Sequence, residues 1–268
     1  MGDNRLLASL ISGSALPIKK HGLSGLVSGG NGAGGYDSGL GSDGNWSTVS
    51  NLTTNDDVAS PSGLGDKSWL SDGSDTIIST DAAQLFPVDS DLTFICWIYP
   101  TTLKAQIVIN SFADNLFVLY GQSSGMTHFE FICKDGLGDQ SGGEASYAFE
   151  ADTWYMVAGT FEASTGKTIS YVFNATSGAG GALKTVATSD VRSVATNTDW
   201  KMLGASSETF AGRVLSPCIW NVELSSSELA ELFNSGAGAT PDTVQKDKIV
   251  CYWDSQTGSA PIENLAIP

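Results

Sequence analysis

The sequence of 268 residues is poor in charged side chains, and above all in basic ones. Charged residues make up 16% of the chain, whereas roughly 25% is usual for globular proteins. Thirteen lysines and arginines stand against 29 aspartates and glutamates, which gives a net charge of −16. Because nucleic-acid affinity depends mainly on Lys and Arg contacts to phosphates, nucleic acid is excluded as the main partner. The same shortage disfavours anionic membrane surfaces.

Long hydrophobic runs are missing as well. No apolar stretch approaches the ~20 residues that a membrane-spanning helix needs, so we expect no membrane insertion. At the N-terminus, Asp3 precedes Arg5, and the run Ser12-Gly13-Ser14 soon interrupts the apolar residues. This pattern is a poor secretory signal, so we expect synthesis in a host cytoplasm without a signal peptide.

Cysteine and histidine are few and scattered. The four cysteines form no CxxC pair, which argues against a structural zinc site. They lie in apolar, strand-like runs and are predicted to be small buried hydrophobes, with a disulfide between neighbouring strands as the alternative: Cys96, Cys133, Cys218 and Cys251. The two histidines, His21 and His128, would have to supply any Ser-His-Asp site, and the one G-x-S-x-G sequence, at 121–125, lies between two strand-like runs and not at a strand-to-helix turn. We therefore expect no hydrolytic serine site.

Glycine is plentiful but unevenly distributed. Residues 1–66 contain 14 of the 31 glycines, and the run 28–35 is especially rich in them. Such a segment loses too much backbone entropy to form a helix or a strand by itself. We predict a glycine-rich N-terminal arm over residues 1–66 and a folded domain over residues 67–268. Because ordering costs about 1–2 kcal/mol per residue, we expect a neighbouring subunit to hold the arm.

From residue 67 onward, short apolar runs follow one another at hairpin spacing. The run 91–99, closed by Pro100, is apolar on both faces, as is typical of a strand inside a sandwich. Comparable runs occupy 105–110, 116–120, 128–133, 154–161 and 168–173. Many short strands at this spacing predict an all-β fold, an antiparallel β-sandwich or jelly roll.

One short helix is predicted near residues 225–235. Ser225 and Glu228 have the spacing of a capping box, in which each side chain satisfies a backbone amide of the first turn. Leu229, Leu232 and Phe233 then follow at i, i+3 and i+4, and Gly236 provides a stop signal. The helix is expected to pack its apolar face on the β domain.

Four segments, taken in order, resemble the laminin-G-like branch of the concanavalin A-like lectin/glucanase jelly rolls: 69–77, 94–100, 154–161 and 210–236. The last is the most specific, because a strand, a capped helix and a glycine stop occur at the family spacing. The sequence departs from the family pattern at Tyr155-Met156 and at Phe173-Asn174-Ala175. The resemblance covers about residues 67–255 and implies a concanavalin A-like jelly roll.

The enzymes of this superfamily carry their two catalytic carboxylates on one strand as E-x-D-x-x-E. Retaining glycosidases need these carboxylates about 5–5.5 Å apart, and alternate residues of a strand share a face. No such motif occurs here. Glu130, between Phe129 and Phe131, is the nearest acid on a strand; it has no second acid at strand spacing and is expected to face solvent. We therefore predict that the protein is not an enzyme, with a divergent glycoside hydrolase as the less favoured alternative.

The resemblance also implies calcium as a cofactor to consider. Laminin-G-like domains often hold Ca²⁺ at a sandwich edge through Asp side chains and backbone carbonyls, and Ca²⁺ prefers such hard oxygen ligands. Asp72 and Asp75 lie in one acidic turn and are the candidate metal ligands, and the turn 135–139 is a second acidic turn. Neither turn matches an EF-hand loop.

Glycan binding is the usual activity of the family and requires an exposed aromatic platform. Four tryptophans lie in strand-like runs and are expected in the core: Trp97, Trp154, Trp220 and Trp253. Trp46 and Trp200 have polar neighbours in the sequence and are the candidate glycan contacts.

We hypothesise a virion structural protein, a capsid-decorating or tail-associated subunit of a tailed bacteriophage. Its arm would bind other virion proteins in an oligomeric assembly, and its jelly roll would face outward at the particle surface and bind host-surface or environmental glycans. The hypothesis combines an extracellular type of fold, an acidic chain, the arm and the poor export signal, and it follows the recurrence of laminin-G-like domains in phage virions. The alternative is a carbohydrate-binding lectin outside any particle.

Overall fold

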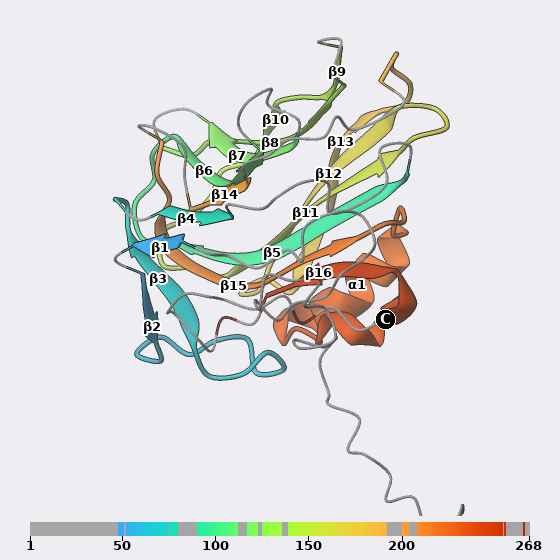
Figure 1. Cartoon of the computed structure of the whole chain (residues 1–268). Coiled ribbons are helices and arrows are strands. Elements are labelled where there is room, and N and C mark those ends of the chain that lie inside the picture. Colours follow the sequence, from blue (N-terminus) through green and yellow to red (C-terminus); the bar gives the residue numbers. More distant parts are fainter. Residues whose placement is uncertain are drawn as a thin grey trace, which may run out of the picture.

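The computed structural model describes residues 48–50, 52–74, 76–79, 90–111, 117–122, 125–135, 139–191, 200–203, 208–253, 255 and 265. Within these residues the chain forms two eight-stranded antiparallel β-sheets and one short α-helix (Figure 1). The predicted antiparallel β-sandwich is therefore confirmed.

The first sheet has the spatial order β1 (Thr48–Ser50), β4 (Thr76–Ser79), β14 (Trp200–Met202), β6 (Gln106–Ser111), β7 (Phe117–Gln122), β8 (His128–Lys134) and β10 (Ala145–Ser146), with β9 (Gln140–Gly142) also paired to β8. The second sheet has the order β13 (Ala179–Val186), β12 (Lys167–Asn174), β11 (Tyr155–Glu162), β5 (Leu92–Pro100), β15 (Ala211–Trp220), β3 (Ser68–Asp72) and β2 (Thr53–Asn55), with β16 (Ile249–Tyr252) also paired to β15. Neighbours such as β5 and β15 are distant in sequence, as the long crossovers of a jelly roll require.

Strand pairing begins earlier in the chain than the sequence indicated. β1 pairs with β4 in the first sheet, and β2 pairs with β3 in the second. The chain therefore crosses from one sheet to the other within residues 48–55. Residues 48–50 and 53–55, which fall in the predicted arm, thus pair with both sheets, whereas residues 1–47 lie outside the described residues, and the division into an arm and a domain stays a prediction.

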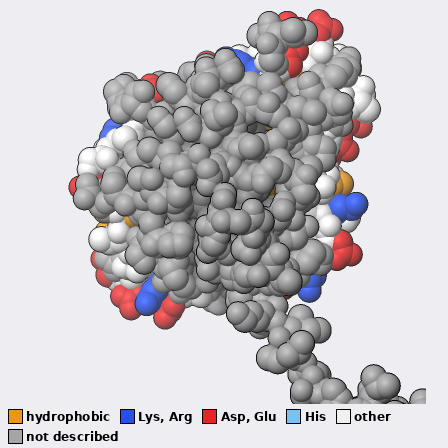
Figure 2. Space-filling view, in the orientation of Figure 1, with side chains coloured by type: hydrophobic (Ala, Val, Ile, Leu, Met, Phe, Trp, Pro, Cys, Tyr) orange, Lys and Arg blue, Asp and Glu red, His pale blue; other side chains and the backbone are white. Residues whose placement is uncertain are grey.

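The surface reflects the acidic composition. In Figure 2, Asp and Glu side chains lie at several places around the periphery of the view, with Lys and Arg side chains among them. Among the residues described, no helix has the length and apolar character that crossing a membrane would require.

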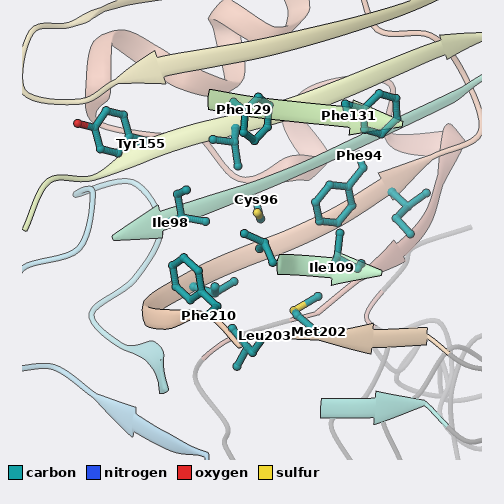
Figure 3. Packing of buried hydrophobic residues seen from close by; sticks show 14 of the residues in the cluster. Phe94, Cys96, Ile98, Ile109, Phe129, Phe131, Tyr155, Met202, Leu203 and Phe210 are labelled. Carbon is teal, nitrogen blue, oxygen red and sulfur yellow. The ribbon is translucent and has the colours of Figure 1, made fainter. Parts of the chain in front are cut away.

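Large apolar side chains fill the space between the two sheets. Phe94, Cys96 and Ile98 of β5 project into the same space as Phe129 and Phe131 of β8 (Figure 3). All five are almost completely buried. This inter-sheet core fixes the register of β5 and β8, because a slip of one residue would turn these side chains away from it.

A second core covers the outer face of the second sheet. Ile95 and Trp97 of β5 are buried there together with Leu229, Leu232 and Phe233 of α1 (Ser226–Phe233). The rings of Trp97 and Phe233 stack with centroids 5.8 Å apart. The apolar character of both faces of β5 therefore has two causes, the opposite sheet on one side and the helix layer on the other.

The helix begins as its sequence predicts. The Glu228 amide donates to Ser225 Oγ at 3.3 Å, and the Ser225 amide donates to Glu228 Oε2 at 2.8 Å. Asn234 ends the helix in a left-handed conformation, and Gly236 follows with φ 95°. Three short 3-10 turns complete this region: η1 (Asn234–Gly236), η2 (Pro241–Thr243) and η3 (Lys246–Lys248).

The four cysteines are buried, reduced thiols, which confirms the prediction that they act as small hydrophobes. Cys218 and Cys251 lie on the neighbouring strands β15 and β16, but Cys218 stands opposite Tyr252 and Cys251 opposite Ile219. Residues directly opposite each other on neighbouring strands point to the same face of the sheet. Cys218 and Cys251 are offset by one residue, so their side chains point to opposite faces. The alternative of a cross-strand disulfide is therefore wrong for this pair.

Candidate functional site

Asp72, a predicted calcium ligand, ends β3 in an exposed turn that closes on itself. Its Oδ1 atom accepts hydrogen bonds from the Ser74 amide at 2.9 Å and from Ser74 Oγ at 2.6 Å. These hydrogen bonds lower the pKa of the Asp72 carboxyl. The turn needs Gly73, which has φ 92° and whose carbonyl accepts a hydrogen bond from Thr209 Oγ1. Asp75, the other predicted ligand, lies outside the described residues.

The second acidic turn has a similar arrangement. Oδ1 of Asp135 accepts a hydrogen bond from the Asp139 amide at 2.9 Å, and residues 136–138 between them lie outside the described part. Nowhere in the described ranges do three His, Cys, Asp or Glu side chains come together as a metal site would require. The predicted calcium ligands Asp72 and Asp75 therefore stay a prediction.

The two predicted glycan contacts fall where their side chains are not described. Trp46 lies outside the described residues. Trp200 begins β14, and its backbone pairs with Ser79 of β4 and Ser111 of β6 in the interior of the first sheet. The predicted role of both tryptophans stays a prediction. The four tryptophans that were assigned to the core are buried, as expected.

A row of three large side chains crosses the outer face of the second sheet beyond the helix layer. Arg213 of β15 stands directly opposite Tyr99 of β5. Trp154, which immediately precedes β11, is the next side chain in the row, and its ring centroid lies 5.3 Å from that of Tyr99. We call these three residues the Arg213 row.

Arg213 is a buried cation with an exposed partner. Its side chain is 4% exposed and pairs through Nη2 with Oδ1 of Asp57, whose side chain is 61% exposed. Nη1 donates to Ser68 Oγ at 3.4 Å. Nε is buried, and the part of the chain that the structure describes offers it no hydrogen-bond partner. An orphaned buried donor costs about 1–3 kcal/mol, so this guanidinium is incompletely satisfied.

Tyr99 lies half-buried between carboxylates. Burial raises the pKa of its hydroxyl, the carboxylates of Asp152 and Asp57 raise it further, and Arg213 opposes them. Asp152 is exposed and is fixed at the end of β5 by its amide, which donates to the Pro100 carbonyl at 2.8 Å. The row therefore offers a partly exposed ring with hydrogen-bond acceptors beside it.

Residues 56–59, which lie between β2 and β3, contact the Arg213 row. The indole Nε1 of Trp154 donates to the Ala59 carbonyl at 3.0 Å, and Asp57 binds Arg213. Asp56, Asp57 and Ala59 are exposed. The segment 56–59 is thus attached to the row at both ends while most of its surface faces water.

Glu130 is 7% exposed, so the expectation that it faces solvent is wrong. Its neighbours Phe129 and Phe131 point into the inter-sheet core, which places Glu130 on the outer face of the first sheet. Gly143 and Lys184 lie close to Glu130 on this face. A Cβ atom placed on Gly143 would be 3.8 Å from Glu130 Oε1 and 3.0 Å from Lys184 Nζ. Burial raises the pKa of the Glu130 carboxyl, and the Glu144 carboxylate raises it further.

The groups around Glu130 come from both sheets. His128 Nδ1 lies 3.3 Å from Glu144 Oε1. Lys184 of β13, an edge strand of the second sheet, donates to the Glu144 carbonyl at 3.0 Å. The acid nearest to Glu130 therefore stands in the turn after β9, paired with a histidine, and not at the i+2 position of the same strand. Sequence reasoning missed this cluster because its members are distant in sequence.

Comparison with protein families gives one match, to the family model described as concanavalin A-like lectin/glucanases superfamily (Laminin_G_3), over residues 72–230. No curated protein matches the sequence.

Several solved structures share the fold at low sequence identity. The binding domain of botulinum neurotoxin serotype D is 16% identical, with a TM-score of 0.53 over 76% of this chain and 49% of that chain. A full-length tailspike protein 2 from an Escherichia coli bacteriophage is 14% identical, with a TM-score of 0.54 over 79% of this chain and 29% of the tailspike. The binding domain of botulinum neurotoxin DC in complex with SialylT is 15% identical, with a TM-score of 0.51 over 72% and 47% of the two chains. The chain spans half the length of these relatives or less.

Proposed function

The chain belongs to the concanavalin A-like lectin/glucanases superfamily, and we propose that it binds carbohydrate at the Arg213 row without hydrolysing it. The lectin-like jelly roll favours a glycan ligand, and the Arg213 row provides a surface on which the glycan can bind. Ligand sites combine aromatic surface with a few polar groups that fix orientation. The observation that carries the proposal is the half-buried Tyr99 ring, which stands opposite Arg213 with its partner Asp57 and lies beside Trp154.

Each part of the row suits one part of a sugar. An aromatic ring face packs against the C–H groups of a pyranose, and Trp154 supports the Tyr99 ring from the side. Ionised carboxylates accept hydrogen bonds from sugar hydroxyls. The binding domain of botulinum neurotoxin DC, solved in complex with SialylT, supports a glycan ligand for this fold by analogy.

A non-catalytic role is supported by the surroundings of Glu130. A retaining glycosidase needs two carboxylates on either side of the scissile bond. Glu130 is covered by Gly143 and Lys184, and the Glu144 carboxylate is paired with His128. Incubation with polysaccharides should therefore release no reducing ends from either wild-type protein or the variant Glu130→Gln. Release by wild type that Glu130→Gln abolishes would establish the glycosidase alternative.

The binding proposal is tested by Tyr99→Leu on a glycan array followed by titration calorimetry. Loss of the ring face should weaken the best glycan by about tenfold, which corresponds to 1.4 kcal/mol. Tyr252→Leu is the matched control, because Tyr252 is half-buried on β16 of the same sheet. An equal loss in both variants, or no loss in either, would contradict binding at the row.

We further propose that the protein is a subunit of a virus particle, capsid-decorating or tail-associated, rather than a lectin outside one. The glycine-rich leading segment and the likeness of fold to a bacteriophage tailspike support this proposal. Deletion of residues 1–47 should leave the melting temperature of the jelly roll unchanged, because every strand of the two described sheets lies at or after Thr48. The same deletion should abolish association with other virion proteins, measured by size exclusion and cosedimentation. Unchanged association would favour the free lectin.

A further inference from the structure

We infer that the Arg213 row is specific for sugars that carry a carboxylate, and that the sugar carboxylate takes the place of Asp57 on Arg213. The inference rests on the proposed glycan binding and names its ligand class. The three nitrogens of the Arg213 guanidinium differ in their hydrogen bonding. Nη2 donates to Asp57 and Nη1 donates to Ser68, whereas the buried Nε has no hydrogen-bond partner within the described residues.

The unused Nε lies on the same edge of the guanidinium as Nη2. A carboxylate that binds this edge makes two parallel hydrogen bonds, the strongest geometry for an arginine–carboxylate pair. Asp57 accepts a hydrogen bond from Nη2 at its Oδ1 atom. A ligand carboxylate that reached both Nη2 and Nε would therefore satisfy a donor that the resting protein leaves unsatisfied.

Asp57 is suited to be the group that is displaced. Its side chain is 61% exposed, so after release it returns to water at little desolvation cost. The buried charge of Arg213 stays neutralised throughout, because one carboxylate replaces another. The exchange thus avoids the state in which the guanidinium is buried without a counter-ion.

The spacing of the row fits one monosaccharide unit. Arg213 and Tyr99 are direct cross-strand partners, and the Cβ atoms of such pairs lie about 4.5–5.5 Å apart. A pyranose packed on the Tyr99 ring would thus hold its exocyclic carboxylate near Arg213. The net charge of −16 opposes anions at a distance, but at physiological ionic strength screening limits that repulsion to about 8 Å.

The test compares methyl β-glucuronide with methyl β-glucoside, which differ in the carboxylate alone, by titration calorimetry at 0.15 M salt. Wild type should bind the glucuronide at least about fivefold more tightly. Asp57→Asn keeps the size of the Asp57 side chain but weakens its competition for Arg213, and it should raise glucuronide affinity about tenfold without raising glucoside affinity. Asp56→Asn removes the same charge from the neighbouring exposed residue and should change neither affinity by more than about twofold.

Arg213→Lys provides the second variant, because lysine keeps the charge and lacks the two-donor edge. It should lose the preference for glucuronide and retain glucoside binding, with folding checked by its melting temperature. Equal gains in Asp57→Asn and Asp56→Asn, or a glucoside gain as large as the glucuronide gain, would overturn the inference. If both sugars bind equally and Tyr99→Leu weakens both, the carboxylate specificity fails and the proposed function stands. If neither sugar binds and no array glycan does, both fail.

Discussion

Nζ of Lys167 lies 2.8 Å from Oε1 of Glu223, and this ion pair joins the β11–β12 hairpin to the segment that leads into α1. Lys167 also lies 3.3 Å from Glu162 Oε2. The Lys167 and Glu223 side chains are both partly buried. Hydrogen bonding to Glu223 raises the pKa of the lysine. The pair is therefore one of the contacts that hold the helix layer on the second sheet.

Replacing Lys167 with Met should lower the free energy of unfolding by about 1 kcal/mol, because it removes the shared cation and leaves the two carboxylates facing each other. A lysine whose pKa is raised by folding contributes stability below its ordinary pKa and loses it as pH rises through the folded value. The difference between wild type and Lys167→Met should thus be present at pH 7 and shrink above about pH 10.5.

Urea unfolding at pH 7 and pH 11 measures this difference. A double-mutant cycle with Glu223→Gln separates the pair from the effect of removing either charge alone. A coupling free energy of zero would show that the contact contributes nothing to stability.

Glu130 should make the fold less stable as pH rises. Burial and the Glu144 carboxylate raise its pKa, with Lys184 and Lys134 opposing, so above the ordinary value of 4.5 the folded state binds more protons than the unfolded one. The contribution of this group is present below pH 4.5 and is lost as pH rises through the folded pKa. Glu130→Gln should therefore flatten the pH dependence of the melting temperature and be at least as stable as wild type at pH 7.

Melting curves between pH 4 and pH 8 compare wild type, Glu130→Gln and the control Glu231→Gln, which changes an exposed acid of α1. His128 Nδ1 lies 3.3 Å from Glu144 Oε1, so a His128→Gln background removes this contact from the comparison. A drop in the melting temperature of Glu130→Gln that grows as pH rises would mean that the ionised carboxylate is stabilising.

The elements that sequence reasoning predicted correctly are those with local signals. The capping box at Ser225 needs residues three apart, and the strand at β5 needs a run of consecutive apolar residues. Strands β1 and β2 were not predicted because each is three residues long and consists mostly of polar residues. Their pairing with β4 and β3 depends on partners elsewhere in the chain.

The Arg213 row could not be predicted from local patterns. Asp57 and Arg213 are 156 positions apart and meet because β2, β3 and β15 are neighbours in one sheet. One signal was available, since Arg213 is the single charged residue of the buried strand β15. A lone arginine in such a strand needs a counter-ion, but the sequence does not indicate which carboxylate supplies it.

Gly159 of β11 is the position where the inter-sheet core should tolerate no side chain. A Cβ added there would overlap the ring of Phe131 from the opposite sheet. Gly159→Ala should therefore destabilise the fold by about 1–3 kcal/mol through overpacking, measured by urea unfolding. Phe131→Leu in the same chain removes part of the ring and should recover some of that loss, whereas the two substitutions would simply add if they acted independently. Additive losses would mean that the cost at Gly159 arises from the β11 backbone, and that the close approach of Phe131 does not determine the residue at this position.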